Sequence, residues 1–379
     1  MILKLGELFC GPGGFGLGAS RAKFRAAGTE WGYRHAWAND AHPDSCETFT
    51  KNLCPDNPSI VKCSKVEKLD FGELDPIDAL TFGFPCNDFS TVGERKGLNG
   101  KFGELYTFGV KALDHFKPSC FVAENVIGLH HAHSGNALGQ ILRELEEAGD
   151  GYNVTAHPYK FEEYGVPQER HRIIIVGIKK SLKKRFRVPA PNSLGEMMTA
   201  EHALTRPPIP SDAANHKFSE LKPRVKERLM HIPPGKNAWY EGIPKHLRLN
   251  VKGAWLSQIY KRLKADAPAY TITGSGGGGT HVYHWKEHRA LTNREKARLQ
   301  TFPDSFIFEG RKDSVRRQIG MAVPPVAARI ILRAVLKTMA GVKYRSIAAK
   351  WESAAPAIEN RPVLKTPPER IEVRIPVPA

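Results

Sequence analysis

A lone cysteine stands in a segment whose residue types could carry out nucleophilic chemistry. Cys86 lies in TFGFPCNDFS, where a short apolar run ends in a Gly-Phe-Pro turn, and Pro85, Asn87 and Asp88 surround it. A buried cysteine usually behaves as a small hydrophobe, but these neighbours are not those of a protein core. The segment therefore favours an exposed, nucleophilic thiol.

A carboxyl group and two guanidinium groups follow in two further segments. CFVAENV delivers Glu124 near the end of an apolar run, where a carboxyl group could cap a helix, pair with a cation or give a proton to a heteroaromatic nitrogen. QERHRIIIV carries Arg170 and Arg172, which are alternate residues and so lie on one face of a starting strand. Two such guanidinium groups suit an anionic or carbonyl-bearing ligand.

A glycine array follows the first apolar run. ELFCGPGGFG places Gly11, Gly13 and Gly16 in a G-x-G-x-x-G pattern, and Asp40 ends the next apolar run in WAND. An acid in that place would bind ribose hydroxyls. The array fits a nicotinamide or flavin site, a sulfonium nucleotide site, or a tight turn with no ligand, and by itself it does not choose.

The elements that must hold these residues alternate between strands and helices. Strands are predicted at 2–9, 33–40, 77–84, 120–126 and 172–179, and helices at 106–116 and 136–149. This alternation predicts an α/β fold with a parallel sheet covered by helices. Cys86 and Glu124 each follow or end a strand, so both are expected at the carboxyl edge, where such sheets bind ligands.

The second half of the chain has a different character. Residues 181–268 are basic and proline-rich, which predicts an insertion dominated by loops. Residues 271–285 are predicted as a strand, a glycine turn and a strand. A helix capped by Thr292 and Glu295 follows, and a long helix entered through prolines is expected at 323–341. The remaining tail is proline-rich, which is typical of an extended or disordered segment.

Composition limits the class of protein. The chain has 379 residues and a formal charge of +17, which favours a nucleic acid as partner. Its six cysteines form no C-x-x-C pair, so reduced thiols are expected. No apolar run looks long enough to span a bilayer and no leader is evident at the start, which predicts a cytoplasmic protein without a membrane partner.

Six segments in order resemble the successive motifs of the DNA cytosine-5 methyltransferases of bacterial restriction-modification systems. They are LFCGPGGFG, GFPCNDFS, AENVIGL, QERHRIIIVG, LTNREKARLQTFPDSF and QIGMAVPP, and the likeness runs from residue 5 to about 330. It implies a Rossmann-like sheet that uses S-adenosylmethionine, with a smaller, loop-rich target recognition domain. It also implies a catalytic and cofactor domain at 1–188, a target recognition domain at 189–288, a hinge and C-terminal helix at 289–345, and a proline-rich tail at 346–379.

The resemblance also implies a mechanism in which Cys86 adds to C6 of a cytosine flipped out of the duplex. Glu124 would hydrogen-bond N3 and the exocyclic amine, and Arg172 would bind O2, with Arg170 supporting the site or a phosphate. The activated C5 then takes the methyl group of S-adenosylmethionine, and Cys86 is eliminated after the C5 proton leaves.

Cofactor and DNA contacts follow from the same likeness. It implies a cofactor site made of Glu7, Phe9, Gly11, Pro12, Gly13, Gly14, Asp40, Pro85 and Leu105. Glu7 stands where the family usually has Asp. Cys63 and Met321 replace an acid that would bind the adenine amine and an asparagine near the methionine moiety.

The expected partner is double-stranded DNA, read in the major groove by residues 189–288, with a possible endonuclease acting on the same site. Ser90, Thr271 and Thr273 are candidate DNA contacts, and the segment 94–105 would close over the base. A monomer associated with the nucleoid is expected.

Three other interpretations remain open from the residues. They are methylation of RNA cytosine by the tRNA-type branch, a catalytically silent DNA-binding homologue, and a nicotinamide-dependent oxidoreductase that rests on the glycine array alone. Two histidine clusters, at 130–133 and 281–288, could suggest a metal site, but neither has zinc-like spacing and no metal is expected.

Overall fold

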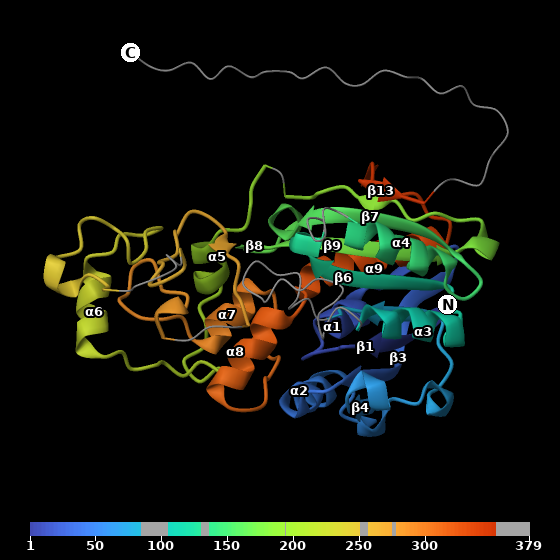
Figure 1. Ribbon diagram of the computed structural model, residues 1–379, viewed down its shortest axis with the longest axis horizontal. Helices are drawn as coiled ribbons and strands as arrows, with labels where there is room; N and C mark the ends of the chain where they lie inside the picture. Colours follow the sequence, from blue (N-terminus) through green and yellow to red (C-terminus); the bar gives the residue numbers. More distant parts are fainter. Residues whose placement is uncertain (85–104, 130–135, 194, 251–256, 275–277, 354–379) are drawn as a thin grey trace, which may run out of the picture.

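The computed structural model describes residues 1–84, 105–129, 136–193, 195–250, 257–274 and 278–353. Figure 1 shows one lobe built around a central sheet and a second lobe of loops and short helices. Helices α7 (Asn293–Leu299) and α8 (Lys312–Met321) lie between the two lobes. Cys86, Pro85, Ser90, the first histidine cluster and the tail from residue 354 fall outside the described residues.

The central sheet has the strand order β13-β7-β9-β6-β5-β1-β3-β2, with β4 paired to β3. Its strands are β1 (Ile2–Leu8), β2 (Phe24–Ala26), β3 (Thr29–Asp40), β4 (Val61–Cys63), β5 (Ala79–Phe82), β6 (Cys120–Val126), β7 (Tyr152–Lys160), β9 (His171–Lys179) and β13 (Trp351–Glu352). The run β4-β3-β1-β5-β6 is parallel throughout, as the alternating pattern predicts. The carboxyl ends of these strands therefore meet at one edge.

The other half of the sheet is antiparallel, so the prediction of a parallel sheet is wrong there. Strand β9 runs antiparallel to both β6 and β7. Only residues 161–170 join β7 to β9, and so short a link favours antiparallel pairing because a parallel crossover needs a dozen or more residues. Strand β7 has no counterpart in the sequence prediction. Its sequence does alternate, with Tyr152, Val154 and Ala156 between polar residues, and its first five residues are all buried.

Helices cover both faces of the sheet. They are α1 (Gly14–Arg21), α2 (Pro43–Leu53), α3 (Tyr106–Phe116), α4 (Asn136–Glu147) and α9 (Pro325–Met339). Phe15 of α1 and Ile331 of α9 belong to the core on one face, while Leu113 of α3 and Ile141 of α4 belong to the core on the other. The bounds of β6 and α3 are those that the sequence predicts, and the arrangement confirms the α/β fold class.

The second lobe is held by small apolar clusters and by buried arginine. It contains α5 (Ala200–Thr205), α6 (Pro223–Met230) and β11 (Ala269–Tyr270), and β11 pairs with β8 (Gln168–Glu169) of the first lobe. Arg262 is 4% exposed and donates to the carbonyl oxygens of Leu229, Ile232, His284 and Trp285. One guanidinium group thus binds three loop carbonyls and one in the last turn of α6, where there is little regular structure to satisfy them.

The prediction of a strand, a glycine turn and a second strand at 271–285 is wrong for the described residues of that segment. Within the described residues β11 ends at Tyr270, and Tyr283 forms only isolated bridges with Arg262 and Ala290. Tyr283 packs in an apolar cluster of this lobe and not in a sheet.

Helices α7 and α9 lie where the sequence predicts helices, whereas α8 has no counterpart in the prediction. Thr292 caps α7 and its hydroxyl accepts from the backbone N–H of Glu295, whose side chain accepts in return from the Thr292 N–H. The stretch Lys312–Met339 is long and apolar enough to cross a membrane, but 72% of its apolar window is buried inside the protein. That stretch comprises α8 and α9 with prolines between them, which is typical of core helices.

Candidate active site

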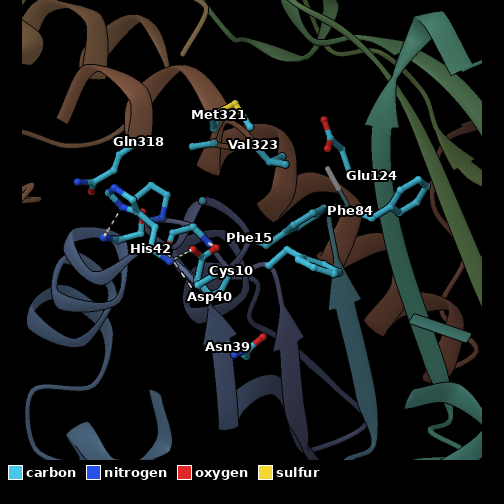
Figure 2. A pocket seen from close by; sticks show the side chains of 18 of the residues that line it. Cys10, Phe15, Asn39, Asp40, His42, Phe84, Glu124, Gln318, Met321 and Val323 are labelled. Carbon is cyan, nitrogen blue, oxygen red and sulfur yellow. Dashed lines mark hydrogen bonds between the residues drawn. The ribbon is translucent and has the colours of Figure 1, made fainter. Parts of the chain in front are cut away.

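A cavity of about 600 Å³ opens at the carboxyl edge of β1, β3, β5 and β6. Its size is that of a cofactor or small-molecule site. Figure 2 shows Asp40, Cys10 and His42 toward one end and Glu124 and Phe84 toward the other, with Phe15 and Val323 between them. The cavity therefore joins the end of the glycine array to the edge that carries the predicted catalytic carboxyl group.

The loop between β1 and α1 forms one wall of the cavity. Phe9, Gly11, Pro12 and Gly14 line it, whereas Gly13 precedes α1 and is absent from the lining. Phe9 has φ 54°, a left-handed conformation that costs energy for a residue with a bulky side chain. A Cβ on Gly14 would lie 2.2 Å from the carbonyl oxygen of Val323, so glycine is needed for the close approach of two backbones.

Glu7 supports this loop from beneath and does not line the cavity. Its carboxylate accepts from the backbone N–H of Gly16 and lies 3.2 Å from Nε2 of His35. Burial raises the pKa of Glu7, and the bonds from His35 and Gly16 oppose that shift. The predicted direct contact with a cofactor is therefore corrected to a positioning role for the start of α1.

Asp40 lies in the cavity at the end of β3, where the sequence predicts it. Its Oδ2 accepts from the Gly11 N–H at 2.9 Å, and its Oδ1 accepts from the His42 N–H at 2.8 Å. Burial raises the pKa of Asp40, while these two bonds lower it. Each carboxylate oxygen has a further lone pair, so Asp40 can still accept hydrogen bonds from two hydroxyl groups.

Glu124 and Arg172 form an ion pair at the opposite end. Nε of Arg172 lies 2.8 Å from Oε1 of Glu124, and the two side chains are 13% and 12% exposed. Both line the cavity, and β6 and β9 place them there by antiparallel pairing. A Cβ on Gly83 would lie 3.4 Å from Oε2 of Glu124. The chain that leads to Cys86 therefore leaves the described structure beside Glu124.

Arg170 contributes to the wall of the cavity but is bound elsewhere. It is 1% exposed, and its Nη1 and Nη2 donate to the carbonyl oxygens of Ile272 and Gly320. Burial lowers the pKa of Arg170, with the charge of Arg172 acting in the same direction. Arg170 and Arg172 therefore line the same cavity, as two residues on one face should, but they have different partners: Arg172 faces Glu124, and Arg170 joins the second lobe to α8.

Two positions depart from the motifs that the chain resembles: Cys63 replaces an acid and Met321 replaces an asparagine. Cys63 is exposed, shares a hydrogen bond with the Cys46 thiol and does not line the cavity. Met321 does line the cavity and lies against Gly274 of the second lobe. An apolar contact thus occupies the place of the asparagine.

Sequence reasoning missed several lining residues, among them His42, Arg317 and Gln318. Gln318 is 2% exposed, accepts from the Thr48 hydroxyl and donates to the Glu309 carbonyl, so it fixes α8 against α2. Arg317 is exposed, and its charge lowers the pKa of Asp40. The sequence signals for these residues are their positions beside known segments: His42 follows WAND, Arg317 precedes QIGMAVPP and Gln318 begins it.

Of the remaining predicted residues, one lines the main cavity, and the others lie apart from it or outside the described residues. Leu105 lines the cavity, and Thr271 and Thr273 line a smaller one. His284 accepts from the backbone N–H groups of Lys286 and Glu287 through Nδ1. Across the described residues no cluster of three histidine, cysteine, aspartate or glutamate side chains could hold a metal.

Replacing Gly320 by alanine is expected to lower stability by roughly 1–3 kcal/mol through overpacking. The added Cβ would lie 2.2 Å from both the backbone nitrogen of Gly274 and the carbonyl carbon of Thr273. Urea unfolding followed by fluorescence measures the change. Gly139→Ala in α4, whose Cβ would lie 3.8 Å from Arg143, is the matched control and should be neutral or stabilising. Equal stability of the two variants would contradict the tight contact.

Comparisons with known proteins agree with this geometry. Residues 3–337 match the family model of the C-5 cytosine-specific DNA methylases. The chain is 56% identical over 370 residues to Type II methyltransferase M.BbvI of Brevibacillus brevis, covering 95% of this chain and 98% of the relative. It is 39% identical over 342 residues to Type II methyltransferase M.NgoFVII of Neisseria gonorrhoeae, covering 88% and 86%.

A solved structure supports the fold. A prophage-encoded protein of E. coli, described as a DNA modification methyltransferase, has a TM-score of 0.67 at 23% identity and covers 89% of this chain and 99% of its own.

Proposed function

Because the chain belongs to the C-5 cytosine-specific DNA methylases and uses S-adenosylmethionine to methylate cytosine C5 in DNA, we propose that Cys86, Glu124 and Arg172 perform that reaction. The observation that supports this assignment best is the Glu124–Arg172 pair, 2.8 Å apart, at the end of the cavity from which the chain continues to Cys86. Asp40 and the loop after β1 lie at the other end.

The residues of the cavity fit the methyl donor. Gly14 lets the loop after β1 pack against the backbone of Val323, and the cavity of about 600 Å³ beside it takes a molecule the size of a nucleoside with an amino-acid arm. Asp40 would accept from the ribose hydroxyls, Phe9 would stack near the adenine, and Gly11, Pro12 and Gly14 would face the methionine arm. The donor supplies an electrophilic methyl group on a sulfonium sulfur. Leu105 and Pro85 would complete the wall.

The protein side of the chemistry follows from the residue types. The Cys86 thiolate forms a bond to C6, and the π electron pair of the C5=C6 double bond shifts through C4 toward N3, which makes C5 the nucleophilic carbon of an enamine. Glu124 gives or shares a proton at N3, and Arg172 holds O2, which stabilises the charge as it develops. After C5 has gained the methyl group, a base removes the C5 proton and the sulfur leaves C6. Arg170 acts indirectly by holding the segment around Ile272.

The chain divides in the way the motifs imply. We assign catalysis to residues 1–188, recognition to 189–288, and the return through a hinge and C-terminal helix to 289–345, with a tail beyond. Ser90, Thr271 and Thr273 would contact the DNA backbone. We further propose a monomer in the cytoplasm, associated with the nucleoid, and a cognate endonuclease that acts on the same sequence.

Bisulfite sequencing of DNA from cells that express the protein tests the function directly. Cytosines within one short sequence should be protected, and cells without the protein should show no protection there. Purified protein with tritiated methyl donor should label duplex DNA. Label that appears only in tRNA would contradict the assignment and favour the RNA branch.

A further inference from the structure

A second, smaller cavity lies where α7 and α8 meet the segment that follows β11. Its walls include Gln258, Thr271, Thr273, Thr280, His281, Lys296 and Arg316. Its volume is about 10 Å³, which is the space that one water molecule needs. The small volume and the cationic wall determine what the cavity can accept.

Lys296 is buried there, and no carboxylate in the described part of the chain forms an ion pair with it. Lys296 is 4% exposed, and no hydrogen bond or ion pair joins its ammonium group to any other described residue. Burial, with the charges of Arg316 and Lys312, lowers the pKa of Lys296 to about 8. The charge of the adjacent Glu295 offsets this shift only in part, and its two oxygens accept from Arg289 and from the Thr292 N–H rather than from Lys296. A buried ammonium group without a partner is costly.

Two further nitrogens at the same place lack partners. Nε of Arg316 and Nδ1 of His281 are buried and have no hydrogen-bond partner in the described part of the chain. Arg316 has an ion pair with Asp313 at 3.4 Å, but Asp313 is 87% exposed and the pair faces solvent. Lys312 points away and donates to the Lys217 carbonyl and the Ser219 hydroxyl. Buried polar atoms are nearly always satisfied, so this cluster calls for an acceptor.

We propose that the small cavity receives one oxygen of a DNA backbone phosphate, held by Lys296 and Arg316. This inference rests on the proposed action on DNA. A cavity of about 10 Å³ is too small to enclose a free phosphate ion, but it accommodates a single oxygen that projects from a polymer. A charged acceptor also forms the stronger type of hydrogen bond with both cations.

The position of the cavity agrees with a strand that enters the catalytic site. Arg316 lines the small cavity, whereas Gly320 and Met321 line the large one. Residues 316 and 321 are separated by roughly 7 Å along a helix that rises 1.5 Å per residue. Arg170 binds the carbonyls of both Ile272 and Gly320, so the two walls are fixed relative to each other. A phosphate near the flipped nucleotide would lie within reach.

The variant Lys296→Met tests the proposal because it keeps the apolar stem and removes the charge. Titration of the full-length protein with a duplex carrying its methylation site should show binding weaker by about tenfold. The slope of log Kd against log salt should fall by about 0.9, the change expected for one lost phosphate contact. Arg333→Met removes an exposed cation on α9 and serves as the matched control, with both quantities unchanged.

A scan of the duplex with single neutral methylphosphonates locates the contact. One position should weaken binding by the wild type and have no additional effect in Lys296→Met. Additive losses at every position would overturn the proposal. If Lys296→Met does not fold, Arg316→Gln replaces it in the same scan. Stabilisation of the DNA-free wild type, but not of the variant, by inorganic phosphate would show a free-anion site and also overturn it.

The outcomes separate this proposal from the function on which it rests. A wild-type protein that methylates DNA, together with a Lys296→Met protein of unchanged Kd and salt slope, refutes the phosphate site alone. A wild-type protein that labels no DNA refutes the proposed function, and the phosphate site with it.

Discussion

Replacing Cys86 by serine is expected to abolish methyl transfer, with a loss of at least about 10⁴-fold in turnover. Serine keeps the size of the side chain but replaces a thiol that is partly ionised near neutral pH with a hydroxyl group that is not. Without addition to C6, the C5 carbon of cytosine is too poor a nucleophile to take the methyl group. Transfer of tritium from labelled donor to duplex DNA measures the loss.

Two controls separate this chemical effect from damage to the fold. Cys63→Ser removes an exposed thiol that does not line the cavity, and it should retain near wild-type turnover. Cys86→Ser should still bind the duplex, and only the wild type should become covalently trapped on a site that carries 5-fluorocytosine. A serine variant with full turnover would refute the covalent mechanism.

The sequence predicted those parts of the fold whose pattern is local. The strand at 120–126 and the helix at 106–116 appear with the predicted bounds, because each combines an apolar stretch with clear ends. The cap at Thr292 could also be predicted, since it depends on two residues that lie three apart in the sequence. Strand β7 was missed although its apolar and polar residues alternate, whereas its burial and its antiparallel pairing with β9 follow only from the assembled sheet.

The residues of the candidate site also divide into those that a local pattern predicts and those that depend on the assembled fold. Asp40 and Glu124 were found because each lies at or near the carboxyl end of a strand, and Arg172 because it accompanies them in a motif. The different role of Arg170 could not be read from alternation along a strand. Its guanidinium group turns toward carbonyls that lie 102 and 150 residues away along the chain. Lys296 and Arg316 likewise meet only because α7 and α8 pack together.

Replacing Glu124 by glutamine is expected to lower the single-turnover rate of methyl transfer by about 10²–10⁴-fold. The amide has the same shape and still forms hydrogen bonds, but it cannot give a proton to N3 as charge develops in the ring. It also removes the negative partner of Arg172, which lies 2.8 Å away in a side-chain pair that is only 12–13% exposed. Quench-flow with labelled donor measures the rate, and donor affinity should stay the same.

The control for this change is Glu169→Gln, which neutralises an exposed carboxylate on β8 that does not line the cavity. It should leave the rate within about twofold of the wild type, as surface substitutions usually do. Arg172→Met separates the two effects of losing Glu124. If the carboxyl group served only to hold Arg172, the double variant would be no slower than Arg172→Met. Because Glu124 is proposed to act on N3 directly, the double variant should be slower still, and equal rates would reject that role.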